Sequence, residues 1–186
     1  MARPVQHRQD AIRRLGEVFR QHGYEGASLT EITAGTGLGK GSLYNFFPGG
    51  KEEMASAVLA DIDGWFADAI FRPLRQDPDP AAAIARMIDG VAAYFDGGGR
   101  VCLVGVFALG QVRDRFADRV QGYFAEWTDA LAAALARGGR PPDQARDMAE
   151  DAVLAIQGAL VLARAVDDRE VFTRALDRLR RRLAPM

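Results

Sequence analysis

The sequence predicts an all-α protein with an N-terminal three-helix domain and a C-terminal helical domain. Alanine, leucine and arginine are abundant along the 186 residues. No segment of useful length alternates apolar and polar residues as a half-buried strand does. The best strand candidate, VCLVGVFAL at 101–109, is apolar on both sides. In an otherwise helical chain we interpret this segment as a buried helix.

The first helix is expected over residues 7–22. Its apolar residues recur at intervals of three and four, which places them on one face of a helix. These residues are Ala11, Ile12, Leu15, Val18 and Phe19. Gly23 follows in the position where glycine usually ends a helix.

Two short helices come next. The segment SLTE at 28–31 has the S-x-x-E pattern of a capping box and opens a helix through about Thr36. Gly37 breaks this helix. The third helix is expected over about 40–47 and stops at the sequence PGG, residues 48–50.

A long fourth helix is expected over about 51–71. Its first turn carries Glu52 and Glu53, and carboxylates there interact favourably with the helix dipole. The proline-punctuated segment RPLRQDPDP at 72–80 reads as a connection. Further helices are expected at about 80–96, 101–110, 112–136, 141–166 and 168–183, separated by GGG at 97–99, Gly110 and GGRPP at 138–142.

Charge is distributed unevenly along the chain. Residues 1–51 carry seven basic and four acidic residues, a net charge of +3, whereas the remainder carries seventeen and twenty-one, a net charge of −4. A mildly basic N-terminal region permits contact with a polyanion. No apolar run approaches the roughly 18 residues of a membrane span, and the charged N-terminus does not resemble a secretory signal. The single cysteine, Cys102, fits a reducing cytoplasm.

Two short helices joined by a glycine turn match a helix-turn-helix. Leu43 and Phe47 are four residues apart and are expected to anchor the third helix on the first two. Polar residues of the same helix then project toward a nucleic acid; they are Lys40, Ser42, Tyr44 and Asn45. Gly39 and Gly41 leave the start of the helix without bulk, so its backbone N–H groups can approach a phosphate.

The segment SLTEITAGTGLGKGSLYNFFPGGKEEM, residues 28–54, resembles the DNA-binding signature of the TetR family of bacterial transcription regulators. The resemblance extends from Ala11 to about Leu59. Within it, FPGGKEEM is most similar to a subgroup that represses multidrug-export genes. The resemblance implies a DNA-binding domain at 1–50 and an effector-binding, dimerising domain at 51–186.

The resemblance also implies roles for individual residues. The third helix would lie in the major groove, with Lys40, Gly41 and Asn45 at positions that approach bases. The positions that hold phosphates are Thr30, Ser42, Tyr44 and Lys51.

The chain departs from the family pattern at three positions. Phe46 stands where the family often has histidine or another polar aromatic residue. Gly35 and Gly39 replace small or hydroxyl-bearing residues, which predicts a more loosely packed DNA-binding domain (the head).

Large apolar side chains in the second domain are candidates for an effector pocket, because small-molecule sites are mostly apolar. The candidates are Trp65, Phe66, Met87, Tyr94, Cys102, Phe107, Phe124 and Trp127. The alternative is that they form ordinary core, which is the commoner role of aromatic residues at helical spacing. Cys102 is either a redox sensor or a buried structural cysteine, and its apolar neighbours favour the latter.

The last two helices resemble the dimer element of the family. The candidate interface residues are Val153, Ile156, Gly158, Leu160 and Val161. A symmetric interface of four helices, two from each subunit, would follow. The basic run RLRRRL at 178–183 is either a second nucleic-acid site or a solvated helix face, and the solvated face is favoured.

The resemblance and these patterns together imply a ligand-responsive repressor that a small, largely apolar effector releases from a palindromic operator. The expected partners are double-stranded operator DNA, an unidentified effector and a second copy of the chain, without a membrane and without a cofactor or metal. Both histidines, His7 and His22, lie near the first helix, and no HExxH, CxxC, GxSxG or phosphate-loop pattern occurs. A helical interaction module or a small helical enzyme remains the alternative.

Overall fold

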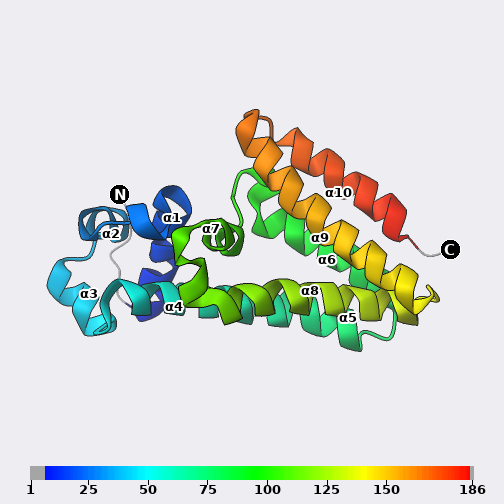
Figure 1. Ribbon diagram of the computed structural model, residues 1–186, viewed down its shortest axis with the longest axis horizontal. Coiled ribbons are helices and arrows are strands. Elements are labelled where there is room, and N and C mark those ends of the chain that lie inside the picture. The colour runs from blue at the N-terminus through cyan, green and yellow to red at the C-terminus, as the bar shows by residue number, and fades with distance from the viewer. Residues whose placement is uncertain (1–6, 185–186) are drawn as a thin grey trace. The chain divides into compact units, whose positions relative to one another are not determined.

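Every regular element in the computed structural model, which describes residues 7–184, is helical (Figure 1). The predicted all-α fold class is therefore confirmed. Contacts within the chain divide it into two units. Unit 1 comprises the residues up to Asp63 together with Leu103–Val120, and unit 2 comprises Gly64–Cys102 and the residues from Gln121 onward. The predicted division at residue 50 concerns which residues bind DNA and which bind effector, and it stays a prediction.

Unit 1 contains the three predicted N-terminal helices and a later segment of the chain. Its elements are α1 (Arg8–Gly26), α2 (Leu29–Thr36), α3 (Lys40–Phe46), the first part of α4 (Gly50–Phe66), α7 (Leu103–Leu109), the 3-10 helix η3 (Gln111–Phe116) and the start of α8 (Ala117–Arg137). The predicted helix over 112–136 was wrong at its start, because residues 111–116 form the tighter 3-10 turns.

Local sequence signals set the ends of the first helices. Gly23 has φ +67° and ψ 178°, so the backbone leaves helical geometry there and α1 continues beyond a kink to Gly26. The Ser28 side chain accepts a hydrogen bond from the backbone N–H of Glu31 at 3.2 Å, as the capping pattern predicts. Gly37 ends α2 in the left-handed conformation, φ +70°, which glycine adopts without steric cost.

Close packing between α1 and α2 explains Gly35. A Cβ atom at this position would lie only 2.3 Å from Cγ2 of Val18, and Val18 is buried. The β-branched valine has few rotamers with which to move away. The glycine that we expected to loosen the head therefore allows two of its helices to approach.

We expect Gly35→Ala to destabilise the protein by about 1–3 kcal/mol, because the added methyl group overpacks the α1–α2 contact. Chemical denaturation measures the free energy of unfolding. Gly41→Ala is the matched control, since nothing lies within 4 Å of a Cβ at that position. Equal stability of the two variants would contradict the packing explanation.

The core of unit 1 combines distant parts of the sequence. Phe19, Leu43 and Phe47 are fully buried, and the burial of Leu43 and Phe47 agrees with their predicted role as anchors. Phe107 of α7 and Phe116 of η3 join them, with 6.1 Å between the ring centroids of Phe19 and Phe107 and 5.4 Å between those of Phe107 and Phe116. Residues 103–109 of the predicted helix thus form a largely buried helix that packs on α1, and Leu109 at its end is exposed.

Unit 2 contains the remaining helices. They are the π-helix η1 (Ala67–Phe71), α5 (Arg72–Gln76), α6 (Pro80–Tyr94), the short 3-10 helix η2 (Asp96–Gly98), α9 (Pro142–Ala165), α10 (Glu170–Leu183) and most of α8. Helices α9 and α10 lie side by side (Figure 1).

The segment 72–80 was wrongly predicted to be a connection, because its first five residues form α5. Pro73 lacks a backbone N–H and cannot make the usual helical hydrogen bond. The preceding turn widens instead, and the N–H of Arg72 bonds to the carbonyl of Ala67, five residues back. A single π-turn of this kind carries the helix past the proline.

Two arginines of the basic run at the end of α10 form ion pairs within unit 2. Arg180 forms an ion pair with Asp89 of α6, and Arg182 forms one with Asp151 of α9. The opposite face of α10 is buried through Phe172, Leu176 and other apolar residues. This arrangement favours the solvated helix face over a second nucleic-acid site.

Candidate nucleic-acid interface

Helix α3 has one anchored face and one exposed face. Leu43 in its middle and Phe47 at its end have no exposed surface. The predicted base and phosphate contacts on α3 are exposed; they are Lys40, Gly41, Ser42, Tyr44 and Asn45. Tyr44 is 47% exposed, which is unusual for a large aromatic side chain. Thr30 of α2 is exposed as well.

The exposed side chains of α3 are available for an external partner. Within residues 7–184, the side chains of Lys40, Ser42, Tyr44 and Asn45 make no hydrogen bond or ion pair. Gly39 and Gly41 face open space, since a Cβ atom at either position would meet nothing within 4 Å. Glycine within a helix costs about 1 kcal/mol relative to alanine, and packing inside the protein gives no reason for that cost at Gly41.

Arginines of α1 hold α2 and α3 in place. Arg8 donates from Nε to the carbonyl oxygen of Phe46 at 3.2 Å, and its guanidinium lies 4.8 Å from the centroid of the Phe47 ring. Arg14 donates to the carbonyl oxygen of Thr36 at 3.0 Å. Both bonds satisfy carbonyls at helix ends, which otherwise lack partners. Neither Arg8 nor Arg14 was predicted as a site residue, because no local pattern shows which carbonyls a surface arginine reaches.

Lys51 lies in the first turn of α4, and its ammonium group contacts α1. Nζ donates to the carbonyl oxygen of Tyr24 at 2.8 Å and lies 4.5 Å from the centroid of the Tyr24 ring. Lys51 is half-buried. The structure thus gives the lysine an intramolecular partner that the sequence did not suggest, and its predicted phosphate contact stays a prediction.

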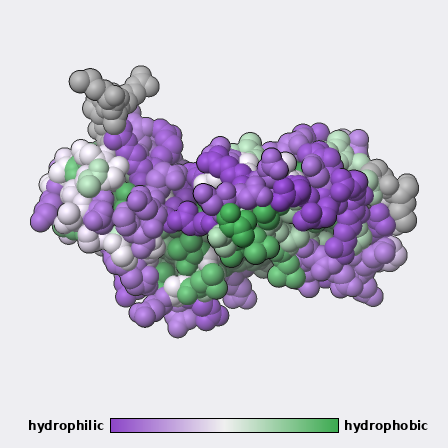
Figure 2. Space-filling model, turned by 90° about the horizontal axis from the view of Figure 1, so that it is seen from above, coloured by the Kyte–Doolittle hydropathy of each residue, from purple (hydrophilic) through white to green (hydrophobic). Residues whose placement is uncertain are grey.

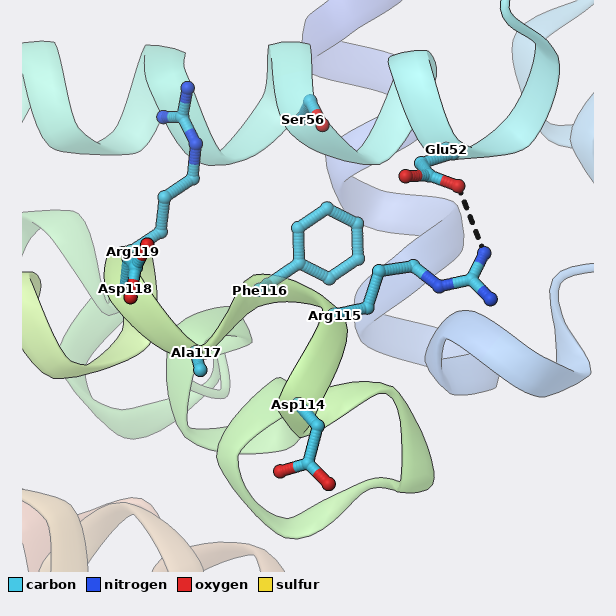
Figure 3. Close-up of a pocket in the computed structure, with 8 residues that line it drawn as sticks. All are labelled: Glu52, Ser56, Asp114, Arg115, Phe116, Ala117, Asp118 and Arg119. Atoms are coloured by element: carbon cyan, nitrogen blue, oxygen red, sulfur yellow. Dashed lines mark hydrogen bonds and ion pairs between the residues drawn. The ribbon is translucent and has the colours of Figure 1, made fainter.

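A polar groove lies beside the first turns of α4 (Figure 3). It is lined by Glu52 and Ser56 and by residues 114–119, with a volume of about 320 Å³. Arg115 reaches across it, and its Nη1 lies 2.9 Å from Glu52 Oε2. The groove presents guanidinium and carboxylate groups together, so it offers no patch of a single charge to DNA.

A second ion pair joins the same segments further along α4. Nη1 of Arg119 lies 3.0 Å from Oδ2 of Asp63. Burial raises the pKa of the Asp63 carboxyl above its ordinary value, while the charge and hydrogen bond of Arg119 oppose this shift. Together with the Arg115–Glu52 pair, this contact fastens the segment 111–120 to α4.

Most of the predicted effector-pocket residues meet in one aromatic cluster of unit 2. Phe66 has no exposed surface. Its ring centroid lies 4.9 Å from that of Tyr94, 4.9 Å from that of Tyr123 and 5.2 Å from that of Trp127. Phe124 joins through Tyr123, with 5.0 Å between their centroids.

Trp65 lies at the surface of this cluster. Its ring is 4.5 Å from that of Tyr94, centroid to centroid, and the residue is 37% exposed. Met87 and Cys102 are buried, and burial favours the structural interpretation of Cys102 over the sensor. Phe107 does not join this cluster, because it packs in the core of unit 1.

The predicted dimer residues do not share one surface. Val153, Ile156 and Leu160 are buried inside unit 2, which leaves them little surface for a second subunit. Gly158 and Val161 are exposed. The large exposed apolar residues of α9 and its end are Leu154 at 69%, Val161 at 62%, Leu162 at 55% and Val166 at 60%. Hydrophobic surface is visible on the face seen in Figure 2.

Between residues 7 and 184, no three His, Cys, Asp or Glu side chains are placed to hold a metal ion. In the same range no helix has the length and apolar character needed to cross a membrane.

Two family models match the sequence. Residues 16–58 match the model of the bacterial regulatory proteins of the tetR family. Residues 80–178 match the C-terminal domain of LmrA/YxaF-like transcriptional regulators. The first match covers the helix-turn-helix, and the second covers most of unit 2 together with the segment 103–120.

Similar proteins are regulators of transcription. The chain is 27% identical over 177 residues to the HTH-type transcriptional repressor DhaR of Mycobacterium sp. (strain GP1), covering 88% of this chain and 85% of DhaR. It is 25% identical over 160 residues to the HTH-type transcriptional regulator YxaF of Bacillus subtilis, with 84% of each chain covered. A cysteine mutant of the TetR family regulator CifR, complexed with 26-base-pair operator DNA, has a TM-score of 0.75 and 25% identity, with 97% of this chain and 98% of CifR covered.

Proposed function

Because the chain belongs to the TetR family of bacterial transcriptional regulators, we propose that it is a homodimeric repressor which a small effector releases from a palindromic operator. It is a DNA-binding regulator of transcription and not an enzyme. Repression, dimerisation, release by an effector and the individual DNA contacts are the parts that we propose beyond family membership. It also places the protein in the cytoplasm, where operator DNA is found.

The two faces of α3 carry the proposal. Leu43 and Phe47 anchor the buried face of the helix, while the polar side chains of its exposed face have no partner within the described residues. Gly41 leaves space for DNA to approach the backbone at the start of the helix. A Cβ at this position would meet nothing in the protein itself. An anchored helix of this kind is suited to enter the major groove of DNA.

We propose that Lys40, Gly41 and Asn45 approach base edges. Asparagine pairs with adenine through two hydrogen bonds, and lysine donates to guanine acceptors. Phosphate contacts are assigned to residues with hydroxyl groups on the same exposed surface; these are Thr30, Ser42 and Tyr44. Phosphate contacts fix the position of the protein on the duplex, whereas base contacts provide the sequence preference.

A dimer is required because one α3 helix contacts few bases. Two heads read half-sites that lie about 34–36 Å apart or a multiple of that distance. The exposed apolar surface of α9 supports a symmetric interface there, since a monomer would leave Leu154, Val161 and Leu162 in water. Gly158 lies between them and permits close approach of a second helix.

The aromatic cluster of unit 2 supports a largely apolar effector. Within residues 7–184, none of the buried residues carries a charge, so this cluster offers an ionic ligand no buried partner of opposite charge. Effector binding would shift α4, which continues from unit 1 into unit 2 after Asp63. A coupling free energy of about 3 kcal/mol would change operator affinity roughly 150-fold.

Fluorescence anisotropy with the DNA upstream of the gene tests the proposal. A scrambled duplex of the same length is the control, and both are titrated across a salt series. We expect binding at least about 1,000-fold tighter to the upstream DNA. Compounds added to the preformed complex then test release. Equal, weak binding to both duplexes and to DNA selected from random sequences would contradict specific operator recognition.

We expect Asn45→Ala to relax the sequence preference at one position of each half-site. The lost base contact is worth about 1–3 kcal/mol of discrimination, while binding to scrambled DNA should not change. Competition between operator variants measures this preference. Ser42→Ala is the control, because loss of a phosphate contact weakens all sequences alike. An unchanged preference in Asn45→Ala would exclude the base contact.

A further inference from the structure

The C-terminal end of α1 depends on a cation from another helix. The last carbonyls of an α-helix lack intrahelical partners, and a positive charge beside them is favourable. The last turn of α1 contains no basic residue. Lys51 of α4 supplies the charge, with Nζ 2.8 Å from the carbonyl oxygen of Tyr24 and 3.5 Å from that of Glu25.

The ring of Tyr24 is fixed on several sides. It stacks on Phe19, with 6.1 Å between centroids, and meets the edges of the Phe107 and Phe116 rings at 6.0 and 5.8 Å. Lys51 Nζ lies 4.5 Å from its centroid. The Tyr24 hydroxyl lies 3.5 Å from Nη1 of Arg115, which also binds Glu52 in the first turn of α4. Figure 3 shows the Arg115–Glu52 contact.

These contacts attach α1 to the residues before and after the turn between α3 and α4. Before the α3–α4 turn, Arg8 at the start of α1 binds the Phe46 carbonyl and covers the Phe47 ring. After the turn, Lys51 binds the end of α1 at Tyr24. Because α3 has only seven residues, its orientation depends on the segments that flank it.

We propose that Lys51 and Tyr24 form a positioning pair that orients α3 for specific DNA binding, and that Lys51 is not a phosphate ligand. This inference rests on the proposed operator binding. The carbonyl oxygens of Tyr24 and Glu25 and the ring of Tyr24 already surround the Lys51 ammonium, at 2.8, 3.5 and 4.5 Å. The end of α1 therefore sets the position of this cation without an external anion.

The salt dependence of DNA binding separates the two roles. A lysine that neutralises one phosphate contributes about 0.9 to the slope of log affinity against log salt concentration. Lys51→Met keeps the aliphatic stem and removes the charge and the donors. We expect operator affinity to fall about tenfold, since a hydrogen bond and a cation–π contact are lost. We also expect an unchanged slope and unchanged affinity for scrambled DNA.

A double-mutant cycle tests whether Lys51 acts through Tyr24. In the background of Tyr24→Leu, which removes the ring and keeps the backbone carbonyl, we expect Lys51→Met to cost less than tenfold, because the cation–π contact is already lost and only the bond to the carbonyl remains. Lys40→Met is the matched control; it replaces the only other lysine of the chain and should cost the same in both backgrounds. Circular dichroism and thermal unfolding verify that each variant is folded.

Specific outcomes overturn the inference. A slope smaller by about one unit in Lys51→Met would identify a phosphate ligand. An equal cost of Lys51→Met with and without Tyr24 would exclude the pair. If Tyr24→Leu does not fold, the slope of Lys51→Met and the recovery of operator affinity in Lys51→Arg decide the question. Failure of the unaltered protein to prefer its operator would instead contradict the proposed function.

Discussion

Replacing Phe107 by alanine is expected to destabilise unit 1 by about 3–5 kcal/mol, the usual cost of truncating a buried phenylalanine. Phe107 is 1% exposed, and its ring contacts those of Phe19, Tyr24 and Phe116. The cavity would open at the contact between α7 and α1. Chemical denaturation measures the loss of stability, and hydrogen exchange of α1 amides shows which unit loses protection.

The same substitution tests whether Phe107 belongs to the core of unit 1 or to an effector pocket. A pocket residue would change effector release while leaving unfolding nearly unaltered, whereas a core residue of the head lowers operator binding as the folded fraction falls. Phe124→Ala is the control in unit 2, because Phe124 is only half-buried and should cost less. Unchanged stability of Phe107→Ala would show that α7 does not stabilise the head.

The position of α7 illustrates what the sequence predicts and what it does not. The segment 101–109 is apolar on both sides, which predicts burial without identifying the surface that covers it. The exposed and buried faces of α3 were predictable, because they follow from local spacing between Leu43 and Phe47. The contact of Phe107 with Phe19 joins residues far apart in sequence, and no local pattern encodes such a pair.

Lys51 and Pro73 show that local sequence patterns also fail to predict some polar contacts and backbone hydrogen bonds. A lysine in the first turn of a helix after a helix-turn-helix suits a phosphate, yet the free carbonyls of α1 lie within its reach. Their availability depends on how α1 and α4 cross. Pro73 predicts an interruption of the helix, but a π-turn absorbs it and α5 continues to Gln76.

Helix α9 explains why the predicted dimer residues do not lie on one face. The helix carries apolar side chains on two faces, and helical spacing alone does not say which face meets the rest of the chain. Val153, Ile156 and Leu160 pack inward, while Leu154 and Val161, seven residues apart, share the exposed face. The surface available to a second subunit therefore lies on the side of Leu154 and Val161.

Val161→Glu is expected to dissociate the proposed dimer and to weaken operator binding by about 10²–10⁴-fold, because two linked heads gain that much over one. In a twofold interface the substitution brings two carboxylates into an apolar surface, and burying an unpaired charge is costly. Val161 is 62% exposed, so the folded chain itself should change by no more than about 0.5 kcal/mol. Analytical ultracentrifugation measures the dimer, and anisotropy measures operator affinity.

Leu109→Glu is the matched control for this prediction. Leu109 is 87% exposed and lies on α7. It belongs to unit 1, whereas α9 belongs to unit 2. The added charge is the same, so a general effect of charge on DNA binding would appear in both variants. We expect only Val161→Glu to lose the dimer. If it remains dimeric and binds operator normally, the subunits associate through another surface, and the exposed apolar face of α9 must bind something else.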